Sequence, residues 1–344
     1  MIKPRIRLLI QSPASLGFGG GNVVVAMLNK YINKFGYDID FLNFIDRNDD
    51  FDVLHLIGMQ VGNCLNGLTA KTKGKKIVLQ SLFYTDTNLF LYKLTEKFMS
   101  HKFWAFSQNK FYLMQQLLNI TDVILVSSKA ELEQMKYIFS FDKSKAKIIH
   151  NGIETEIFDD IDDNFIEKFN LKPGYVLCVA NINKKKNILN LIKAFLLTGL
   201  DTKLVLVGIY NDDPDLFYCN EVKKLIDESE GKIVRVENIS KGLLASAYLN
   251  AKIHVLPSFW ELPGLVSLEA GLAGAGLVLG DCAPVREYFG NLATYCNPND
   301  ISDITDKITK AYNLSPTIKL SRFIKTNYSW TEIAKKLAVI YDSL

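Results

Sequence analysis

The chain has 344 residues, of which 48% are hydrophobic and 22% are charged, and this composition is that of a globular protein with two domain-sized cores. Its formal net charge is only +3, and no basic arm or aromatic-basic motif is present, so we expect no nucleic acid partner. The five cysteines lack any C-x-x-C pair, which argues against a zinc site and indicates reduced thiols in a cytoplasmic protein.

The N-terminus is basic and then apolar, but charges interrupt the apolar run, and it is too short for a secretory signal. No stretch reaches the roughly 18 apolar residues that span a bilayer. We therefore predict that residues 6–10 form the first strand of a cytoplasmic protein.

The first half of the chain alternates β-rich runs with polar or glycine-rich turns, as parallel α/β sheets do. Gly19, Gly20 and Gly21 follow the first strand and precede a helix that ends at Gly36. Backbone amides at such a turn can approach a phosphate, and three glycines also form a simple tight turn. The later elements expected in this half are strands at 38–44, 51–58, 75–83 and 121–128, and a helix at 130–139.

Residues 90–118 interleave lysine with phenylalanine, tryptophan and tyrosine at helical spacing. The pattern predicts two helices whose apolar faces pack inward. Lysine beside exposed aromatic rings also suits an anionic lipid surface, and this second interpretation stays open.

The second half begins after residues 159–173, an acidic and polar stretch that ends in proline and that we interpret as an interdomain connection. Residues 175–180 form a predicted strand, and three successive lysines, residues 184–186, lie between this strand and the next helix. Cationic side chains at such a position can reach a phosphate.

Residues 253–281 carry the most informative pattern. A buried strand at 253–256 is followed by a loop with Glu261 and by a predicted helix at 265–272 that contains Glu269. The free amides at the helix start suit a phosphate, whereas the two carboxylates suit ligand hydroxyls, and together they indicate a nucleotide sugar. In the alternative, both glutamates are solvated surface charges. The small residues that follow Glu269 favour close approach of a ligand.

Residues 257–289 resemble the donor-site signature of the retaining glycosyltransferases of family 4: a serine after proline, two glutamates separated by seven residues, an alanine-glycine helix, a strand and a proline-glutamate turn. Further matches follow in the same order along nearly the whole chain. The resemblance implies the GT-B fold, an α/β architecture of two Rossmann-like, doubly wound parallel-sheet domains facing a cleft. It places the acceptor-side domain at 1–160, the donor domain at 174–325, and a helix at 326–344 that crosses back to pack on the first domain.

The resemblance also assigns roles to individual residues. Glu261 and Lys186 are the expected catalytic residues, with Glu261 orienting the sugar hydroxyls and Lys186 stabilising the departing diphosphate. Glu269 would bind the ribose, and the backbone near residues 236–239 would contact the base. The expected donor-binding residues are Gly19, Gly20, Gly21, Asn181, Lys185, Gly264, Leu265, Val266, Glu269, Glu237 and Ile239.

The chain departs from the family pattern at two places. Asn181 stands where relatives carry an arginine, and Lys184 or Lys185 can supply the missing charge. Relatives also carry an acceptor-side histidine after the strand that here ends at Gln80, and this chain has none there. The acceptor-side candidates are therefore His55, which is otherwise a core histidine of its strand, and Asp86.

The resemblance implies a hexosyl-type transferase of the EC 2.4 class that moves a sugar from a UDP- or GDP-sugar to a glycan or lipid-linked hydroxyl. Its setting would be bacterial cell-surface polysaccharide synthesis, such as O-antigen, lipopolysaccharide or capsule. We expect no metal or other cofactor, no protein nucleophile, and peripheral contact with anionic lipid on the inner face of the membrane. The alternatives are a non-catalytic nucleotide-sugar-binding subunit of a glycosylation complex and a GT-B nucleotide-sugar epimerase.

Overall fold

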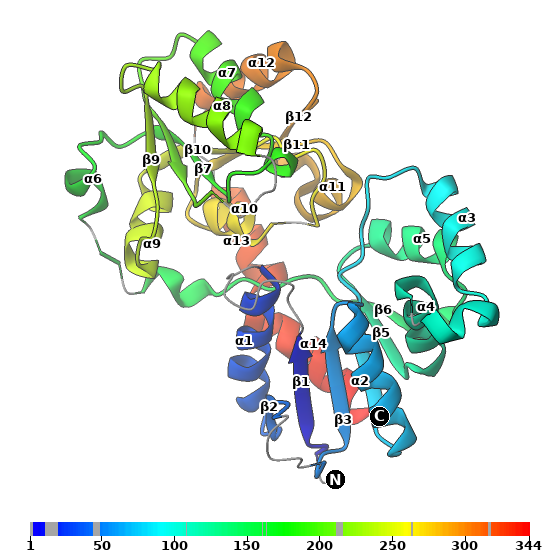
Figure 1. The fold of residues 1–344 in the computed structure, drawn as a ribbon. Helices are drawn as coiled ribbons and strands as arrows, with labels where there is room; N and C mark the ends of the chain where they lie inside the picture. The colour runs from blue at the N-terminus through cyan, green and yellow to red at the C-terminus, as the bar shows by residue number, and fades with distance from the viewer. Residues whose placement is uncertain are drawn as a thin grey trace. The chain divides into compact units, whose positions relative to one another are not determined.

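The computed structural model describes residues 3–10, 20–43, 49–107, 109–159, 161–162, 164–210, 216–262, 264–315 and 318–344. They divide into two compact units: unit 1 comprises Met1–Gly152 and Trp330–Leu344, and unit 2 comprises Ile153–Ser329 (Figure 1). Each unit contains a six-stranded sheet in which every described strand pair is parallel. The α/β class indicated by the alternating pattern and the two parallel sheets implied by the family resemblance are confirmed.

Unit 1 has the strand order β2-β1-β3-β4-β5-β6. Its elements, with 3₁₀ helices written η, are β1 (Ile6–Ile10), α1 (Gly20–Asn33), β2 (Ile39–Phe41), β3 (Val53–Ile57), α2 (Val61–Thr72), β4 (Lys76–Gln80), α3 (Leu89–Met99), η1 (Lys102–Ser107), α4 (Lys110–Ile120), β5 (Val123–Val126), α5 (Lys129–Ile138), η2 (Lys143–Lys145), β6 (Ala146–Ile148) and α14 (Trp330–Asp342).

Helices cover both faces of the unit 1 sheet, which explains why its central strand β3 is buried at every position rather than at alternate ones. Strand β3 illustrates this arrangement, because successive side chains of a strand point to opposite faces. Val53 and Ile57 pack with α1 and α14, whereas Leu54 and Leu56 pack with α2 and α4. His55 shares the face of Val53 and Ile57 and therefore points toward α14.

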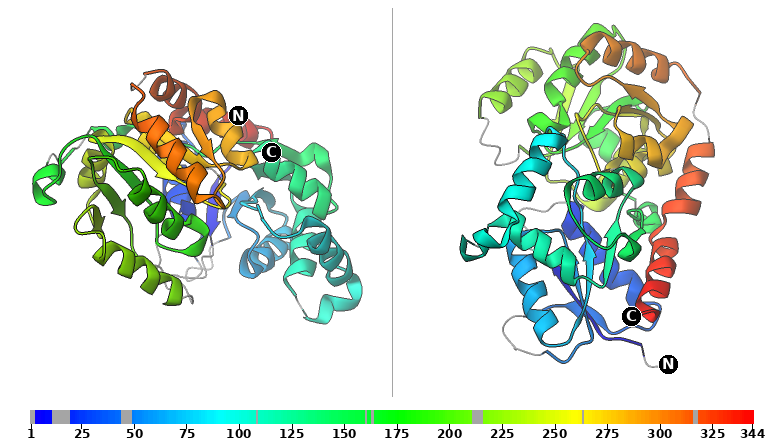
Figure 2. Two further views of the ribbon diagram at one scale, coloured as in Figure 1. Left: turned by 90° about the horizontal axis from the view of Figure 1, so that it is seen from above. Right: turned by 90° about the vertical axis from the view of Figure 1, so that its right-hand side faces the viewer.

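The C-terminal helix α14 belongs to unit 1, where it lies beside α1 (Figure 2). Three residues of α14 are buried in the core that α1 and α14 form with one face of the unit 1 sheet: Trp330, Leu337 and Tyr341. The hydroxyl of Tyr37 donates hydrogen bonds to the Ala338 carbonyl at 2.8 Å and to Oδ1 of Asp342 at 2.6 Å. The expected return of the last helix to the first domain is thus confirmed.

Unit 2 has the strand order β12-β11-β10-β7-β8-β9. Its elements are η3 (Thr155–Phe158), α6 (Phe165–Lys168), β7 (Tyr175–Val179), η4 (Lys184–Lys186), α7 (Ile188–Leu197), β8 (Leu204–Val207), α8 (Leu216–Asp227), β9 (Ile233–Val236), α9 (Lys241–Leu249), β10 (Ala251–Leu256), α10 (Leu265–Leu272), β11 (Gly276–Gly280), α11 (Ala283–Phe289), η5 (Gly290–Leu292), β12 (Thr294–Cys296), α12 (Ile301–Tyr312) and α13 (Ile318–Tyr328).

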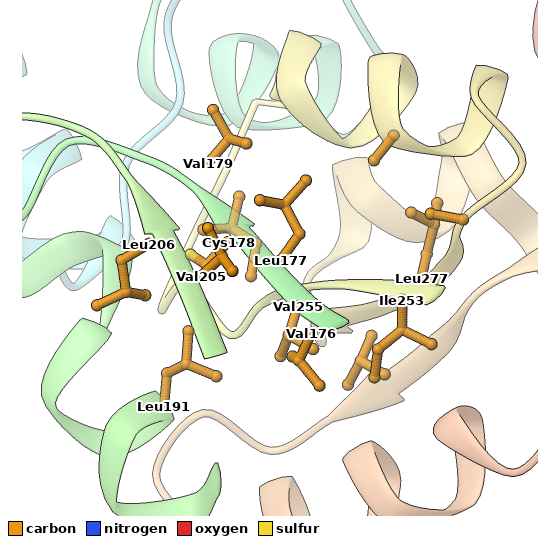
Figure 3. Packing of buried hydrophobic residues seen from close by; sticks show 14 of the residues in the cluster. Val176, Leu177, Cys178, Val179, Leu191, Val205, Leu206, Ile253, Val255 and Leu277 are labelled. Atoms are coloured by element: carbon orange, nitrogen blue, oxygen red, sulfur yellow. The ribbon is translucent and has the colours of Figure 1, made fainter. Parts of the chain in front are cut away.

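The core of unit 2 forms around its central strands, β7 and β10. All five residues of β7 are buried, as expected for a parallel strand covered on both faces. Figure 3 shows Val176 close to Val255 of β10 on one side of the sheet, with Leu177 on the other. The two strands pair directly, and His254 lies opposite Leu177, so this histidine is held inside the core. These strands position the loops at their carboxyl ends.

The chain enters unit 2 earlier than the composition suggests. The boundary lies at Ile153, whose N–H donates to the Tyr328 carbonyl at 2.7 Å. The acidic stretch at 159–173, interpreted as an interdomain connection, belongs to unit 2 where it is described. Phe165 is completely buried there, and its ring lies 4.9 Å from that of Phe169. A few apolar side chains in a polar stretch are enough to dock it on a core, and composition averages do not reveal them.

Candidate functional site

The loop that follows β10 carries Glu261 at the carboxyl edge of the unit 2 sheet. Gly280 of the adjacent β11 allows this loop to approach closely, because a Cβ at that position would lie 2.1 Å from the backbone oxygen of Ser258. The side chain of Glu261 is only 10% exposed, and the Ser258 hydroxyl donates to its Oε2 at 3.4 Å. The carboxylate of Glu261 is therefore buried and fixed by a hydrogen bond, and Glu261 is not a solvated loop residue.

Two lysines of η4 converge on Glu261. The ammonium of Lys186 forms an ion pair with Oε2, and that of Lys185 lies 3.7 Å from Oε1. Lys185 also lies over the Trp260 ring at 3.5 Å, and its carbonyl accepts a hydrogen bond from Phe259 N–H at 3.0 Å. Because the lysines and the carboxylate are partly desolvated, their attraction is stronger than in water. The sequence-predicted catalytic pair is thus brought together.

Asparagine side chains on either side hold the lysine turn in place. Oδ1 of Asn183 accepts a hydrogen bond from Lys186 N–H at 3.0 Å. Asn187 adopts the left-handed conformation with φ of 59°, which asparagine tolerates well. Its buried amide donates at 3.0 Å and 2.7 Å to the carbonyls of Pro257 and Pro298. The turn is therefore fixed to the same loop that carries Glu261.

Helix α10 begins directly after this loop, and Gly264 is its N-cap residue. Glycine has no side chain that could cap the helix, so the N-cap residue leaves the first amides, those of Leu265 and Val266, without a side-chain acceptor. Such amides suit an anion, and the partial positive charge of the helix start adds to the effect. A small pocket adjoins this point and is lined by Leu256, Ser258, Glu261, Gly264, Ser267, Leu279, Gly280, Val285 and Phe289.

Glu269 lies in the second turn of α10 and is half-buried. The hydroxyl of Tyr248, from α9, donates to its Oε2 at 2.6 Å. Burial raises the pKa of Glu269, and the Tyr248 hydrogen bond opposes this rise. Among the described residues no hydrogen bond reaches Oε1, which remains an acceptor for a ligand hydroxyl. Glu269 is therefore not a solvated helix-surface charge.

A buried histidine lies behind the site. Nε2 of His254 is 3.3 Å from the Ser267 hydroxyl of α10, and the side chain is inaccessible to solvent. Burial, assisted by the charge of Lys186, lowers the pKa of His254 to about 3. A neutral imidazole avoids an unpaired buried charge beside the lysine turn.

This neutral histidine predicts a pH-dependent stability. The unfolded imidazole binds a proton below its usual pKa of 6.5, whereas the native one stays neutral down to about 3, so the contribution is complete above 6.5 and declines below it. Between about pH 7.5 and about pH 5.5, the free energy of unfolding should fall by about 1 kcal/mol more for the natural chain than for His254→Gln. Denaturant unfolding of both proteins at the two pH values measures this. Parallel pH profiles would contradict the assignment.

The other donor-side candidates lie near the ends of two strands. Asn181 is half-buried in the segment after β7. Glu237 is exposed just after β9 and pairs with Arg235 at 2.5 Å. Ile239 packs against the unit 2 core. No described contact joins Glu237 to Glu261 or Glu269, so its role as a ligand residue remains a prediction.

The candidates in unit 1 differ in accessibility. His55 is fully buried with Nδ1 2.7 Å from the Tyr341 hydroxyl of α14, and burial lowers its pKa to about 3. Of the two interpretations of His55, the structure favours the core histidine. Asp86 is exposed in the loop between β4 and α3. Gly19 lies outside the described residues, and Gly20 and Gly21 form the start of α1 rather than a turn before it. Glycine is acceptable there because the first helical amides need no intrahelical partner.

Sequence analysis did not identify Tyr248 or Asn187 as parts of the site, and it included Ser258 only as the serine after proline in the donor-site signature. Tyr248 was the most accessible to prediction, because it is the one aromatic residue of helix α9. Its bond to Glu269, however, joins two helices separated by a strand, and no spacing rule predicts such a bond. Among the described residues no group of three or more His, Cys, Asp or Glu side chains is arranged to hold a metal.

The fold and this arrangement correspond to a known family. The chain belongs to the glycosyl transferases group 1, whose family model matches residues 159–330. An uncharacterized glycosyltransferase of Methanocaldococcus jannaschii is 27% identical over 238 residues, which cover 63% of this chain and 59% of that protein. The O-antigen chain mannosyltransferase B of Escherichia coli is 28% identical over 153 residues, 42% of this chain and 39% of the relative. The chain thus spans less than two thirds of the length of both relatives.

Solved structures extend the similarity to the whole fold. The Anabaena protein HepE, in complex with UDP-glucose, aligns with a TM-score of 0.74 at 12% identity over 99% of this chain and 100% of its own. At this identity the likeness concerns the fold alone, and it agrees with the GT-B architecture of two parallel α/β units.

Proposed function

We propose that the protein is a retaining glycosyltransferase that transfers a sugar from a nucleoside diphosphate sugar to a hydroxyl of a glycan or lipid-linked acceptor. The observation that carries the proposal is the convergence of Lys185 and Lys186 on Glu261, next to the uncapped start of α10. Cations and helix amides suit the diphosphate, and the carboxylates of Glu261 and Glu269 suit the sugar and ribose hydroxyls.

In the proposed reaction the bond between the anomeric carbon and the diphosphate oxygen breaks while a bond to the acceptor oxygen forms on the same face. The acceptor proton passes to the leaving phosphate, so no protein nucleophile takes part. Lys186 and the amides of Leu265 and Val266 stabilise the charge that develops on the diphosphate. Glu261 keeps Lys186 in place and accepts hydrogen bonds from the sugar. This chemistry requires no metal ion.

The relatives support a role in polysaccharide assembly. One is named an O-antigen chain mannosyltransferase, and a structural neighbour binds UDP-glucose. We extend the proposal to a GDP- or UDP-sugar donor, an acceptor in cell-surface polysaccharide synthesis, and peripheral attachment of the protein to the cytoplasmic side of a membrane. Asn181, which stands where the family pattern has an arginine, favours a non-catalytic nucleotide-sugar-binding subunit as the second candidate.

Calorimetric titration with UDP, GDP, ADP and their common sugars, without added metal, tests the donor assignment. We expect one nucleotide family to bind, and we expect slow release of free sugar from that donor by hydrolysis. Binding without any hydrolysis or transfer would favour the non-catalytic subunit. If no nucleotide binds, the donor site assignment is wrong.

A further inference from the structure

Helix α3 of unit 1 has two distinct faces. Its inner face packs on α4 and α5, with the Tyr92 ring 5.7 Å from that of Phe83 and with Glu96 buried. Its outer face exposes Phe90, Leu91, Leu94 and Phe98, each by more than half of its surface, and Phe103 of η1 is exposed to 67%. The spacing of 90, 94 and 98 places one apolar stripe along the helix. The surfaces of soluble proteins rarely expose so many large apolar side chains together.

Positive charges border this stripe. Lys93 and Lys97 of α3 and Lys102 of η1 are exposed, and Lys110 follows at the start of α4. The only acidic residue between positions 89 and 110 is Glu96, which is buried on the inner face. The outer surface of α3 and η1, called here the α3 surface, is therefore apolar at its centre and cationic at its margins.

We propose that the α3 surface binds an anionic lipid bilayer, with Phe90, Leu94 and Phe98 entering the interfacial region and the lysines contacting lipid phosphates. Amphipathic helices of this composition lie in the plane of the interface. The charge pattern favours lipid over a protein partner, because every exposed ionic group of α3 and η1 is a cation. No described helix has the length and apolarity to cross a bilayer, so contact through this surface is interfacial.

The loop that leads into α3 is rigidly connected to unit 1. Oε1 of the buried Glu131 accepts hydrogen bonds from the Ser81 hydroxyl at 2.6 Å and from Phe83 N–H at 2.7 Å. The Gln134 side chain accepts from Thr85 N–H at 3.0 Å and donates to its carbonyl at 2.8 Å.

The same loop continues directly into the helix that faces the lipid. Asn88 caps α3 by accepting from Phe90 N–H and Leu91 N–H. The loop therefore holds Asp86 at a set distance from the membrane-binding stripe. This placement rests on the proposed function, since it presents the acceptor-side loop to a lipid-linked substrate at the bilayer surface.

Vesicle sedimentation of the full chain tests the inference directly. We expect binding at low salt to phosphatidylcholine vesicles that contain about 30% phosphatidylglycerol, and weaker binding at high salt and without the anionic lipid. A double variant, Leu94→Ser with Phe98→Ser, should bind at least about tenfold more weakly. The reason is that it loses the favourable free energy of transferring two apolar side chains from water into the lipid interface. Lys93→Gln with Lys97→Gln should also weaken binding by about tenfold, and this loss should vanish at high salt.

The matched control is Phe217→Ser in unit 2, because Phe217 is also a highly exposed helical phenylalanine, at 76%. It should leave vesicle binding unchanged. Thermal unfolding should match the natural chain for all variants, because the substituted side chains are exposed.

A protein that stays in the supernatant with anionic vesicles at low salt overturns the inference. So does a doubled solution mass that Leu94→Ser with Phe98→Ser abolishes, since the occupant would then be a second copy. Neither of these results would change the outcome of the calorimetric nucleotide titration. Conversely, a titration in which no nucleotide binds would not change the binding of the protein to vesicles. The two proposals can therefore fail separately.

Discussion

Lys186→Met should lower kcat for sugar transfer by about 10²- to 10³-fold, the usual loss when one preorganised group that stabilises a leaving charge is removed. Lys186 is only 19% exposed and pairs with Glu261, so we expect no cation from the solvent to occupy its position after the substitution. Among the described residues, substitution leaves Lys185, at 3.7 Å from Oε1, as the cation paired with Glu261. Steady-state kinetics with the donor identified by calorimetry measures the effect.

Lys184→Met is the matched control for this prediction. Lys184 belongs to the same 3₁₀ turn but is exposed, and its removal should change kcat less than threefold, about the size of a surface-charge effect. Equal losses in the two variants would show that only the overall positive charge of the turn matters. A kcat unchanged in Lys186→Met would remove Lys186 from the catalytic site.

Glu269→Ala should raise the Kd of the nucleotide sugar by about 10- to 100-fold, the loss expected for hydrogen bonds between ligand hydroxyls and a charged acceptor. The carboxylate is preorganised by the Tyr248 hydroxyl at 2.6 Å, so little entropy is lost when a ribose binds. Calorimetry with the nucleoside diphosphate and with the intact donor should show the same loss, because the contact is to the nucleoside part.

Two variants make this result specific. Tyr248→Phe keeps the carboxylate but removes its donor, and it should weaken binding by a smaller factor than Glu269→Ala. Glu228→Ala removes an exposed glutamate in the turn directly after α8, elsewhere in unit 2, and should leave Kd unchanged. If Glu269→Ala binds the donor normally, the ribose assignment is wrong and Glu269 serves only to hold α9 against α10.

Much of the fold could be predicted because parallel sheets leave local signals. The strands around Val176 and Val255 are short apolar runs between polar turns, and this pattern is a property of neighbouring residues. Proline and glycine likewise mark the turn between β10 and α10. The error at residues 159–173 has the opposite cause, since burial of Phe165 depends on a core formed by distant strands.

The candidate site could likewise be predicted only in part from the sequence. The sequence by itself determined that Glu261 precedes a helix start and that Glu269 lies within that helix, because both facts depend on short-range spacing along one chain segment. Only the tertiary structure decided that Lys186, separated from Glu261 by 75 positions, reaches its carboxylate. It also decided that Tyr248 holds Glu269, that His55 is enclosed by α14, and that the apolar stripe of α3 is exposed. Such contacts depend on strand order and on which helix faces pack inward, and these are properties of the folded sheet rather than of any one segment.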